Sequence, residues 1–432
     1  MSRTIAVHVG SRGDLVGHLR YNREGSRESA SFEYDPGWLE SSGGFAIDPA
    51  LLRLVRGPQF HKRMHRDDTV FHGAIADTEP DGWGKRVILR DHAKRRAEGR
   101  ATIARSGEPL NRLDFLLAVD DQSRVGALRF RDESGEFQRA PAPEGRRTPP
   151  SVSLAQLVAS SHAVEMDQET MADLDYLRGR GTSLGGLRPK CSIVTPDGHL
   201  AIGKFPSVED QRAVTKGEVL AMRIAQDAGV RTAEASLVET GGLAVAVVRR
   251  FDRDGASRIP YISAATLLGV SPRDPEPHSY MEIVDALRTH GDNVAHEAEE
   301  LWRRVALSIL ITNLDDHLLN HGFLHRGHGR WALSPAFDIN PFPDRVRELK
   351  TWISESSGPA ASLDLLLEAA PYFQVKPARA REIVGEVDRA VSTWRIRGRE
   401  IGMSNAELDH FADAFEHAER EVARRIEARR GP

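Results

Sequence analysis

The sequence predicts an α+β protein, in which a β-rich first half precedes a mostly helical second half. Two patterns indicate this fold class. Up to residue 252, short runs alternate apolar and polar side chains, as strands with one buried face do, and turn residues separate them. From residue 253 onward, apolar residues recur mostly at helical spacing. With 432 residues, the chain is too long for one hydrophobic core, so we expect two or three domains.

Residues 1–138 are predicted to form a β-rich N-terminal domain. Alternating runs at 4–10, 15–22 and 30–35 indicate three strands at its beginning. A proline-rich stretch, "RAPAPEGRRTPP" at 139–150, contains almost no large apolar side chain and is predicted to be a linker or an exposed loop. We therefore place the first domain boundary at this stretch.

Residues 139–252 are predicted to form a small lobe. Two strands flank a type I turn that begins at Thr195, and a glycine-rich loop precedes them. A helix with Gly229 near its end follows, and then a second hairpin. Residues 253–432 are predicted to form a helical lobe, which one short β pair near residues 322–334 interrupts. A small sheet lobe joined to a helical lobe offers a cleft for a ligand.

The composition argues against several classes of protein. Lys and Arg number 59 and Asp and Glu number 63, so the net charge of −4 does not suggest a nucleic-acid-binding surface. Cys191 is the one cysteine, which excludes an intramolecular disulfide and a cysteine-cluster metal site and fits a reducing compartment. No run approaches the ~18 apolar residues of a membrane span, and the first residues show no apolar signal core. We therefore expect a cytoplasmic protein without membrane contact.

The segment "TNLDDHLLNHGFL" (312–324) brings two carboxylates and an amide to the end of a strongly apolar run. Burying a carboxylate is costly unless it is paired or holds a metal ion. Asp315 and Asn320 have the D-x-x-x-x-N spacing with which protein kinases place a base at the substrate hydroxyl and an amide on Mg²⁺. Asp338, after a short predicted strand, supplies a second carboxylate for the metal. The spacing alone is weak, because it often occurs by chance.

The other parts that phosphoryl transfer needs follow the order found in protein kinases. Lys204 lies on the apolar face of a predicted strand, where its ammonium group must point into a core or a cleft. Glycines within 179–186 form a flexible loop before that strand, which suits close approach to phosphates. Glu218, near the start of the next helix, is either the partner of the lysine or an ordinary exposed residue. Together these parts predict a two-lobed, protein-kinase-like fold.

Five segments make the sequence resemble the HipA family, the kinase components of bacterial HipBA-type toxin–antitoxin systems. The resemblance covers nearly the whole chain, and its central motifs are specific to the family. It implies a HipA-like fold with a β-rich N-terminal subdomain and a helical C-terminal lobe. The segments are "SLGGLRPK" (183–190), "AIGKFPS" (201–207), "RRFDR" (249–253), "NLDDHLLNHGF" (313–323) and "LSPAFDINP" (333–341).

The resemblance implies a role for each matching residue. Asp315 resembles the catalytic base, and Asn320 and Asp338 resemble the Mg²⁺ ligands. His317 is counted with the catalytic residues, although a structural role fits it equally well. Lys204, which resembles the lysine that holds the ATP phosphates, is also counted as catalytic. The predicted nucleotide-binding residues are Ser183, Leu184, Gly185, Gly186, Lys204, Arg249, Phe251 and Asp252.

Two of these residues carry more specific expectations. Asp252 is expected to reach the ribose, beside a hinge under the adenine. Ser183 matches the serine that family members autophosphorylate with loss of activity. A phosphate there would add about −1.5 to −2 charges to a loop that cradles the ATP phosphates, and repulsion would expel the loop. An idle hydroxyl is the simpler alternative for a loop serine.

The resemblance implies an ATP- and Mg²⁺-dependent serine/threonine kinase, the toxin of a type II toxin–antitoxin module. It would phosphorylate a cellular protein, for example one of the translation machinery. Its expected partner is a HipB-like, DNA-binding antitoxin, so contact with DNA would be indirect. The alternative is a catalytically weak scaffold that acts mainly in an antitoxin–DNA repressor complex. The intact set of Lys204, Asp315, Asn320 and Asp338 argues against this alternative.

Four histidines that recur every three or four residues suggest a different chemistry. With Asp315 they could form a helical zinc site and a hydrolase. Gly322 is predicted to end the helix, so His325 would leave the shared face. Asp316 is expected to remain a surface residue. The four histidines are His317, His321, His325 and His328.

Overall fold

The computed structural model divides the chain into two compact units. Unit 1 comprises Met1–Glu209, Val238–Ile262 and Gly327–Gly329. Unit 2 comprises Asp210–Leu237, Ser263–Arg326 and Arg330–Pro432. The structure describes residues 2–63, 68–80, 82–100, 108–131, 135–138, 153–178, 186–343 and 346–428. The predicted linker at 139–150 lies outside these ranges, so the three-domain division stays a prediction.

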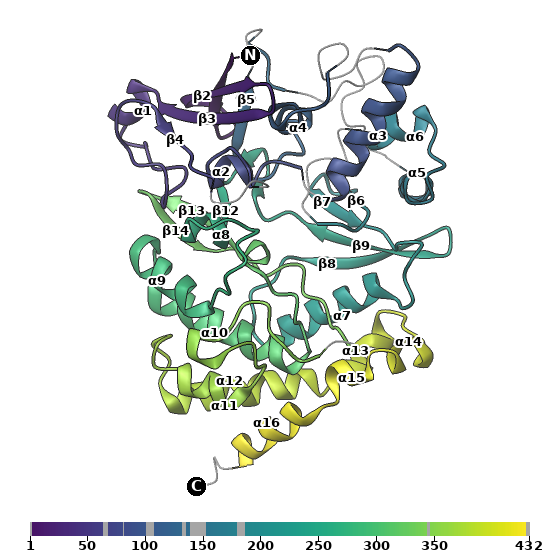
Figure 1. The fold of residues 1–432 in the computed structure, drawn as a ribbon. Helices are drawn as coiled ribbons and strands as arrows, with labels where there is room; N and C mark the ends of the chain where they lie inside the picture. Colours follow the sequence, from purple (N-terminus) through teal and green to yellow (C-terminus); the bar gives the residue numbers. More distant parts are fainter. Residues whose placement is uncertain are drawn as a thin grey trace. The chain divides into compact units, whose positions relative to one another are not determined.

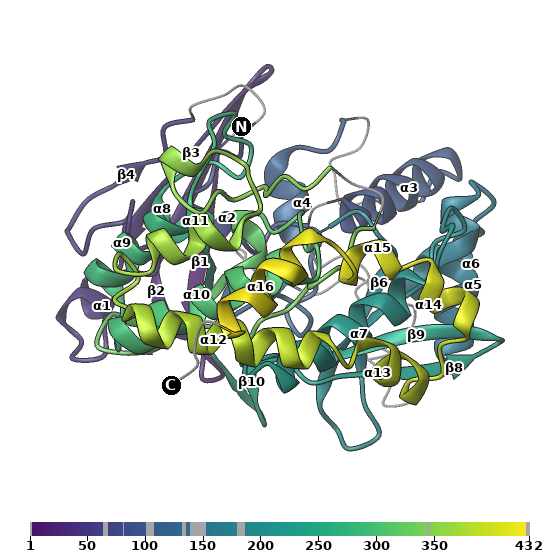
Figure 2. The same cartoon turned by 90° about the horizontal axis from the view of Figure 1, so that it is seen from below.

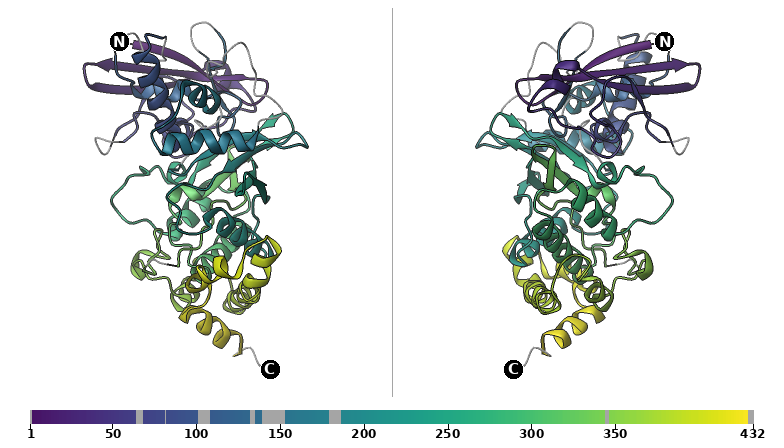
Figure 3. Two further views of the ribbon diagram at one scale, coloured as in Figure 1. Left: turned by 90° about the vertical axis from the view of Figure 1, so that its right-hand side faces the viewer. Right: turned by 90° about the vertical axis from the view of Figure 1, so that its left-hand side faces the viewer.

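Unit 1 begins with a five-stranded antiparallel sheet in the order β4-β3-β2-β1-β5 (Figure 1). Apolar side chains on alternate positions build its buried face, on which Ile5, Leu19 and Phe32 lie opposite one another on three neighbouring strands. The side views show β1, β2 and β3 as long neighbouring arrows (Figure 3). The three strands predicted at the beginning of the chain are therefore confirmed. The bounds are β1 Ser2–Val9, β2 Asp14–Glu24, β3 Arg27–Tyr34, β4 Gln59–Phe60 and β5 Leu128–Arg131.

Short helices accompany this sheet, and two more follow the predicted linker. Ser153 caps the first of the latter two, because its side chain accepts a hydrogen bond from the main-chain N–H of Gln156. The bounds are α1 Pro36–Glu40, α2 Gly73–Ala76, α3 Trp83–Ala97, α4 Arg112–Ala118, α5 Leu154–Glu165 and α6 Met171–Leu177.

A second sheet, most of which lies in unit 1, has the order β6-β7-β9-β8. One of its faces carries Cys191, Ile193 and Ala201, and this face packs against apolar side chains of α3, α5 and α6. The predicted small sheet with one helix between residues 185 and 250 is confirmed, because α7 (Val214–Asp227) lies between β7 and β8 in the chain. The bounds are β6 Lys190–Val194, β7 Leu200–Lys204, β8 Ala235–Thr240, β9 Leu243–Arg249, β10 Arg253–Asp254, β11 Ser257–Arg258 and β12 Tyr261–Ser263.

Unit 2 is mostly helical, as predicted. Its central helix α10 is buried along most of its length. In the view of Figure 2, α12 and α16 lie side by side, and an ion pair between Asp388 and Arg420, 2.5 Å apart, joins them. The bounds are α8 Ala264–Leu268, α9 Tyr280–His290, α10 Val294–Leu310, α11 Leu363–Ala369, α12 Pro377–Val391, α13 Trp394–Glu400, α14 Asn405–Asp409, α15 Ala412–Phe415 and α16 Ala418–Ala428.

The predicted β pair after α10 is confirmed by β13 (Gly322–Gly327) and β14 (Arg330–Leu333). Gly322 begins a strand, whereas the sequence suggested that it ends a helix. The helix ends earlier, at Leu310, and a single turn of 3₁₀-helix at Leu318–Asn320 precedes the strand. Within the described ranges, no helix combines the length and the apolarity that crossing a bilayer requires.

Candidate active site

The candidate catalytic loop of unit 2 begins with a sharp turn at Thr312. Its φ of 57° is a left-handed conformation that β-branched residues rarely adopt. Two contacts hold it: the Thr312 hydroxyl donates to the carbonyl oxygen of Ala414 at 2.8 Å, and the guanidinium of Arg347 donates to this hydroxyl at 2.6 Å. Strained residues of this kind gather at functional sites, where the surrounding structure fixes them. The turn takes the chain out of α10 before the aspartates are reached.

Asp315 and Asn320 are brought together within this loop, as the D-x-x-x-x-N motif requires. The side-chain amide of Asn320 donates to the main-chain oxygen of Asp315 at 3.1 Å, and its main-chain N–H donates to the carbonyl oxygen of His317 at 2.8 Å. Both side chains are half-buried. In the described part of the chain, no group donates to the amide oxygen of Asn320. This oxygen is therefore available to a cation, while the amide nitrogen fixes the loop.

Asp338 also lies in unit 2, in a segment that is tied to the catalytic loop. It adopts a left-handed φ of 56°, and the side-chain amide of Asn340 lies 3.2 Å from its carboxylate. Asn313 joins the two segments, because its side-chain oxygen accepts from the main-chain N–H of Asn340 at 3.1 Å and its amide donates to Ser308 at 3.2 Å. Sequence analysis did not single out Asn313, although it begins the catalytic-loop motif.

The donor set fits a magnesium ion. Mg²⁺ prefers oxygen ligands and keeps several positions for water and substrate phosphates, so one amide oxygen and one carboxylate from the protein suffice. Asn320 and Asp338 are the residues that would supply these two oxygens. The described residues contain no group of three or more His, Cys, Asp or Glu side chains arranged to hold a metal ion.

The four histidines near the loop have different surroundings and do not form one site. The ring of His321 lies 3.1 Å from the carboxylate of Asp316, and that of His325 packs edge-on against Trp331. His328 has a left-handed φ of 50° between β13 and β14. His317, by contrast, is half-buried beside Asp315, and its Nδ1 is buried without a hydrogen-bond partner among the described residues.

The burial of Asp316 differs from the expectation. This residue was expected at the surface, but only 6% of it is exposed. The polar pattern of the loop did not reveal this burial, because the groups that surround Asp316 come from distant parts of the chain.

Lys204 lies in unit 1, at the end of β7. It shares a sheet face with its direct cross-strand neighbours Lys190 and Ala246, and this is the face opposite the Cys191 core. Lys190 is only 7% exposed. Like charges placed directly opposite each other on two strands repel. The sequence contained the information for this pairing, since the turn at Thr195 sets the register, but Lys190 was not assigned a role.

Of the predicted glycine-rich loop, the structure describes Gly186 and the residues after it; Ser183, Leu184 and Gly185 lie outside the described residues. Gly186 has a φ of 92°, and its carbonyl oxygen accepts from the main-chain N–H of Trp83 at 2.9 Å. At Gly82 a Cβ atom would lie 2.3 Å from that oxygen, so only glycine fits there. The end of the loop is therefore anchored on the start of α3.

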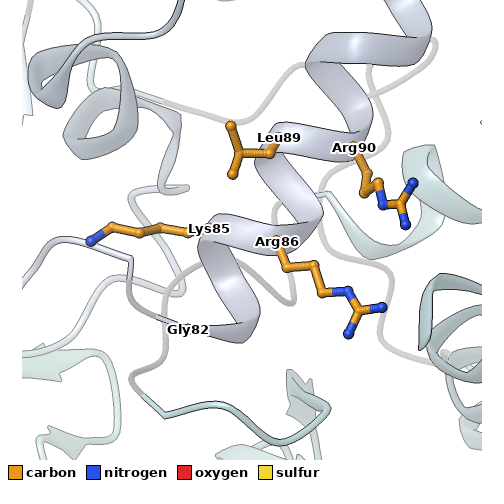
Figure 4. Close-up of a pocket in the computed structure, with 5 residues that line it drawn as sticks. All are labelled: Gly82, Lys85, Arg86, Leu89 and Arg90. Carbon is orange, nitrogen blue, oxygen red and sulfur yellow. The ribbon is translucent and has the colours of Figure 1, made fainter. Parts of the chain in front are cut away.

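A pocket of about 400 Å³ lies beside this anchor (Figure 4). Figure 4 shows the side chain of Lys85 pointing away from those of Arg86 and Arg90. Arg86 donates to the carbonyl oxygen of Val164 at 3.0 Å, and Arg90 forms an ion pair with Asp167. The basic side chains thus do not converge on one point. The lining residues are Gly82, Lys85, Arg86, Leu89 and Arg90.

The predicted hinge segment, Arg249 to Phe251, begins at the last residue of β9 in unit 1. The guanidinium of Arg249 contacts the ring nitrogens of His199 at 2.9 and 3.0 Å, and the ring of Phe251 lies 6.2 Å from that of Tyr261. Both Arg249 and Phe251 are half-buried.

Asp252 has surroundings that argue against the expected contact with a ribose. It is 4% exposed, and its carboxylate accepts hydrogen bonds from Arg250 at 2.8 Å, Arg253 at 2.9 Å and the main-chain N–H of Gly126 at 2.7 Å. Burial alone would raise the pKa of Asp252, but the two guanidinium groups lower it to about 2. The carboxylate is therefore an anchor between the hinge segment and the N-terminal region.

Comparison with known proteins supports the family. Residues 7–129 match the model of the HipA N-terminal domain, and residues 182–394 match that of the HipA-like C-terminal domain. A Haemophilus influenzae protein described as a putative kinase is 26% identical over 188 residues, which are 38% of this chain and 55% of that protein. The chain thus spans about half the length of this relative.

Two solved structures are also similar. A chain of the Shewanella oneidensis MR-1 toxin–antitoxin complex of HipA, HipB and operator DNA matches 98% of this chain with 97% of its own, at 14% identity and a TM-score of 0.60. The Helicobacter pylori proinflammatory kinase CtkA matches 58% of this chain with 95% of its own, at 15% identity and a TM-score of 0.45. The first match confirms the predicted HipA-like fold. With both domain models matched in order along the sequence, the chain belongs to the HipA family.

Proposed function

We propose that this protein is an ATP- and Mg²⁺-dependent serine/threonine protein kinase. The observation that carries the proposal is the arrangement in unit 2, where Asn313 ties the Asp315–Asn320 loop to the segment of Asp338. Phosphoryl transfer needs little covalent chemistry from the protein, so positioned charges and one base are sufficient. This tie supports the proposal, because an inactive scaffold would not need to hold two candidate oxygen ligands and a candidate base on connected segments.

In the proposed reaction, the carboxylate of Asp315 orients the substrate hydroxyl and accepts its proton as the oxygen attacks the γ-phosphorus of ATP. The bond between the γ-phosphorus and the bridging oxygen breaks, and ADP leaves. Lys204 and Lys190 bind the phosphate oxygens. Asn320 and Asp338 would hold Mg²⁺, which would neutralise the charge of the phosphates.

The proposed biological context is a toxin–antitoxin module with a HipB-like, DNA-binding antitoxin. The Shewanella structure, which contains HipA, HipB and operator DNA, supports this proposal through its similar fold. The net charge of −4 is consistent with DNA contact through the partner only. The substrate is proposed to be a cellular protein.

Autophosphorylation of Ser183 is the proposed regulation. Ser183 lies three positions before Gly186, which is anchored on Trp83, and the charge that a phosphate adds at Ser183 would repel the phosphates of ATP. Mass spectrometry after incubation with ATP tests this. Phosphate elsewhere with Ser183 unmodified would remove the mechanism and leave the kinase assignment in place.

The test of the kinase assignment uses purified protein, labelled ATP, Mg²⁺ and cell lysate. Wild type is expected to transfer phosphate to protein, and Asp315→Asn is expected to lose about 10²-fold or more of this activity, the scale for removing a general base. Asp413→Asn, which changes an exposed aspartate of unit 2, is the matched control and should behave as wild type. A wild-type protein that consumes no ATP would favour the scaffold alternative.

A further inference from the structure

Asp316, the neighbour of the proposed base, is a buried carboxylate that the proposed reaction does not use. Its carboxylate accepts a hydrogen bond from the Tyr280 hydroxyl at 2.6 Å and from the Ser308 hydroxyl at 3.4 Å. Nε2 of His321 lies 3.1 Å from the other carboxylate oxygen. These partners come from α9, from α10 and from the residue before β13, so three elements of unit 2 converge on one side chain.

The main chain around Asp316 is held as well. The Thr351 hydroxyl donates to its carbonyl oxygen at 2.6 Å, and the main-chain N–H of Lys350 donates to that of Leu314 at 3.0 Å. The residues on either side of Asp315 are therefore fixed from the segment at 350–351, and the Asp315 side chain between them is half-buried. The backbone on which the base sits has little freedom to move.

The carboxylate stays charged in this place. Burial alone would raise the pKa of Asp316, but His321 and the Tyr280 hydroxyl outweigh burial, and the pKa lies below its ordinary value. The same contact and burial raise the pKa of Tyr280. Replacing a buried ion pair by apolar residues is often neutral or stabilising, so stability alone gives weak grounds for a charge here. Fixing a unique geometry is the better explanation.

We propose that Asp316 is a positioning residue, which acts through Tyr280 and His321 to hold the Asp315 carboxylate at the distance from the substrate hydroxyl that proton transfer requires. This inference rests on the proposed kinase function. Misplacement of a reacting group by about 1 Å can cost about 10²-fold in rate, so a small shift of this loop has a measurable effect.

The test compares two variants of the network with a matched control. Tyr280→Phe removes the 2.6 Å hydrogen bond and keeps the ring, and Asp316→Asn keeps the shape and removes the charge. The control is Tyr372→Phe, which removes the 2.5 Å hydrogen bond from a tyrosine to Asp285 elsewhere in unit 2. Steady-state kinase assays well below the melting temperature give kcat and the KM for ATP.

Tyr280→Phe is expected to lower kcat about 10-fold or more with an unchanged KM for ATP, and Tyr372→Phe to change neither. Asp316→Asn is expected to act in the same direction. In the Asp315→Asn background, Tyr280→Phe should lower the residual activity no further, because the group that it positions is already gone. Folded Tyr280→Phe protein with wild-type kcat, or an equal further loss in that background, would overturn the proposal.

The outcomes distinguish a failure of the positioning role from a failure of the kinase assignment. If wild type is active and Asp315→Asn is not, but Tyr280→Phe retains full kcat, the positioning role fails and the kinase assignment stands. If wild type shows no phosphoryl transfer, both fail. If Asp316→Asn does not fold, Tyr280→Phe still tests the positioning role, because this change removes only one hydroxyl group from the folded protein.

Discussion

Two short segments, 249–253 in unit 1 and 313–321 in unit 2, each carry an aspartate that is almost completely buried. In the first segment Asp252 is surrounded by the guanidinium groups of Arg250 and Arg253. In the second, Asp316 is held by two hydroxyl groups and a histidine, and its neighbour Asp315 stays half-buried. The comparison teaches that a motif identifies a segment, whereas burial decides which carboxylate in it can meet a ligand.

The difference in partners gives the two carboxylates different tasks. Asp252 neutralises permanent charges, and Arg250 in turn donates to the carbonyl oxygens of Ser123 and Arg124, so the cluster joins the N-terminal region to the hinge segment. Removing the Asp252 carboxylate would leave the buried guanidinium groups of Arg250 and Arg253 without it as a partner. Asp316 binds mostly neutral groups, so its removal should disturb geometry more than stability.

The largest effect on stability is expected from Asp252→Ala. This change leaves the guanidinium groups of Arg250 and Arg253 buried without their carboxylate, which costs about 3–5 kcal/mol for breaking a buried pair from one side. Urea unfolding followed by tryptophan fluorescence measures the cost. Asp14→Ala, at an exposed aspartate of the same unit, is the control and should unfold as wild type does. An equal denaturation midpoint for Asp252→Ala would refute the role of the cluster.

Asp315→Asn should show the reverse behaviour in unit 2. Its activity is expected to fall by about 10²-fold or more, which corresponds to about 2.7 kcal/mol of barrier height. Its free energy of unfolding should change by less than about 0.5 kcal/mol, because the Asp315 side chain is half-buried and not enclosed as that of Asp316 is. Parallel kinase and unfolding measurements check this, and a large loss of stability would contradict the division of tasks between Asp315 and Asp316.

Acid should weaken unit 1 through Asp252. Because the pKa of this group is about 2 in the folded protein and about 3.9 in an unfolded chain, its ionised form stabilises the fold above pH ~4. That contribution, about 2–3 kcal/mol, is lost as the pH falls from about 4 to about 2. Melting temperatures of wild type and Asp252→Asn should therefore converge over this interval. Parallel pH profiles for the two proteins would mean that the carboxylate is not held in its charged form.

The smallest effect is expected at the anchor of the glycine-rich loop. Gly82→Ala would place a Cβ atom 2.3 Å from the carbonyl oxygen of Gly186 and should displace that end of the loop. We expect the KM for ATP to rise about 3–10-fold with little change in kcat, the opposite of the pattern expected for Tyr280→Phe. Gly99→Ala is the control, since it has a similar φ of 65° at the other end of α3 with no atom within 4 Å of the added Cβ. Equal KM values for the two variants would show that the anchor does not affect nucleotide binding.

The sequence by itself determined the first three strands of the first sheet, the two hairpins of the small lobe and the order of the kinase-like motifs. These features depend on local periodicity and on turn residues, which a single sequence contains. Even the opposition of Lys190 and Lys204 followed from the turn at Thr195, because a hairpin turn fixes the register of its strands. The candidate residues Asp315, Asn320 and Asp338 were identified in the same way, from type, spacing and order.

Only the tertiary structure decided which of these side chains are buried. Asp316 meets Tyr280, 36 positions earlier, and Arg250 meets Ser123, 127 positions earlier. The early end of α10 likewise depends on Thr312, whose left-handed conformation is held by Ala414, 102 positions later. No local pattern encodes such partners, since a charged residue looks the same in a sequence whether it faces water or a distant hydrogen-bond donor. The burial of a carboxylate is settled when these remote segments pack, because only their donors offset the loss of hydration.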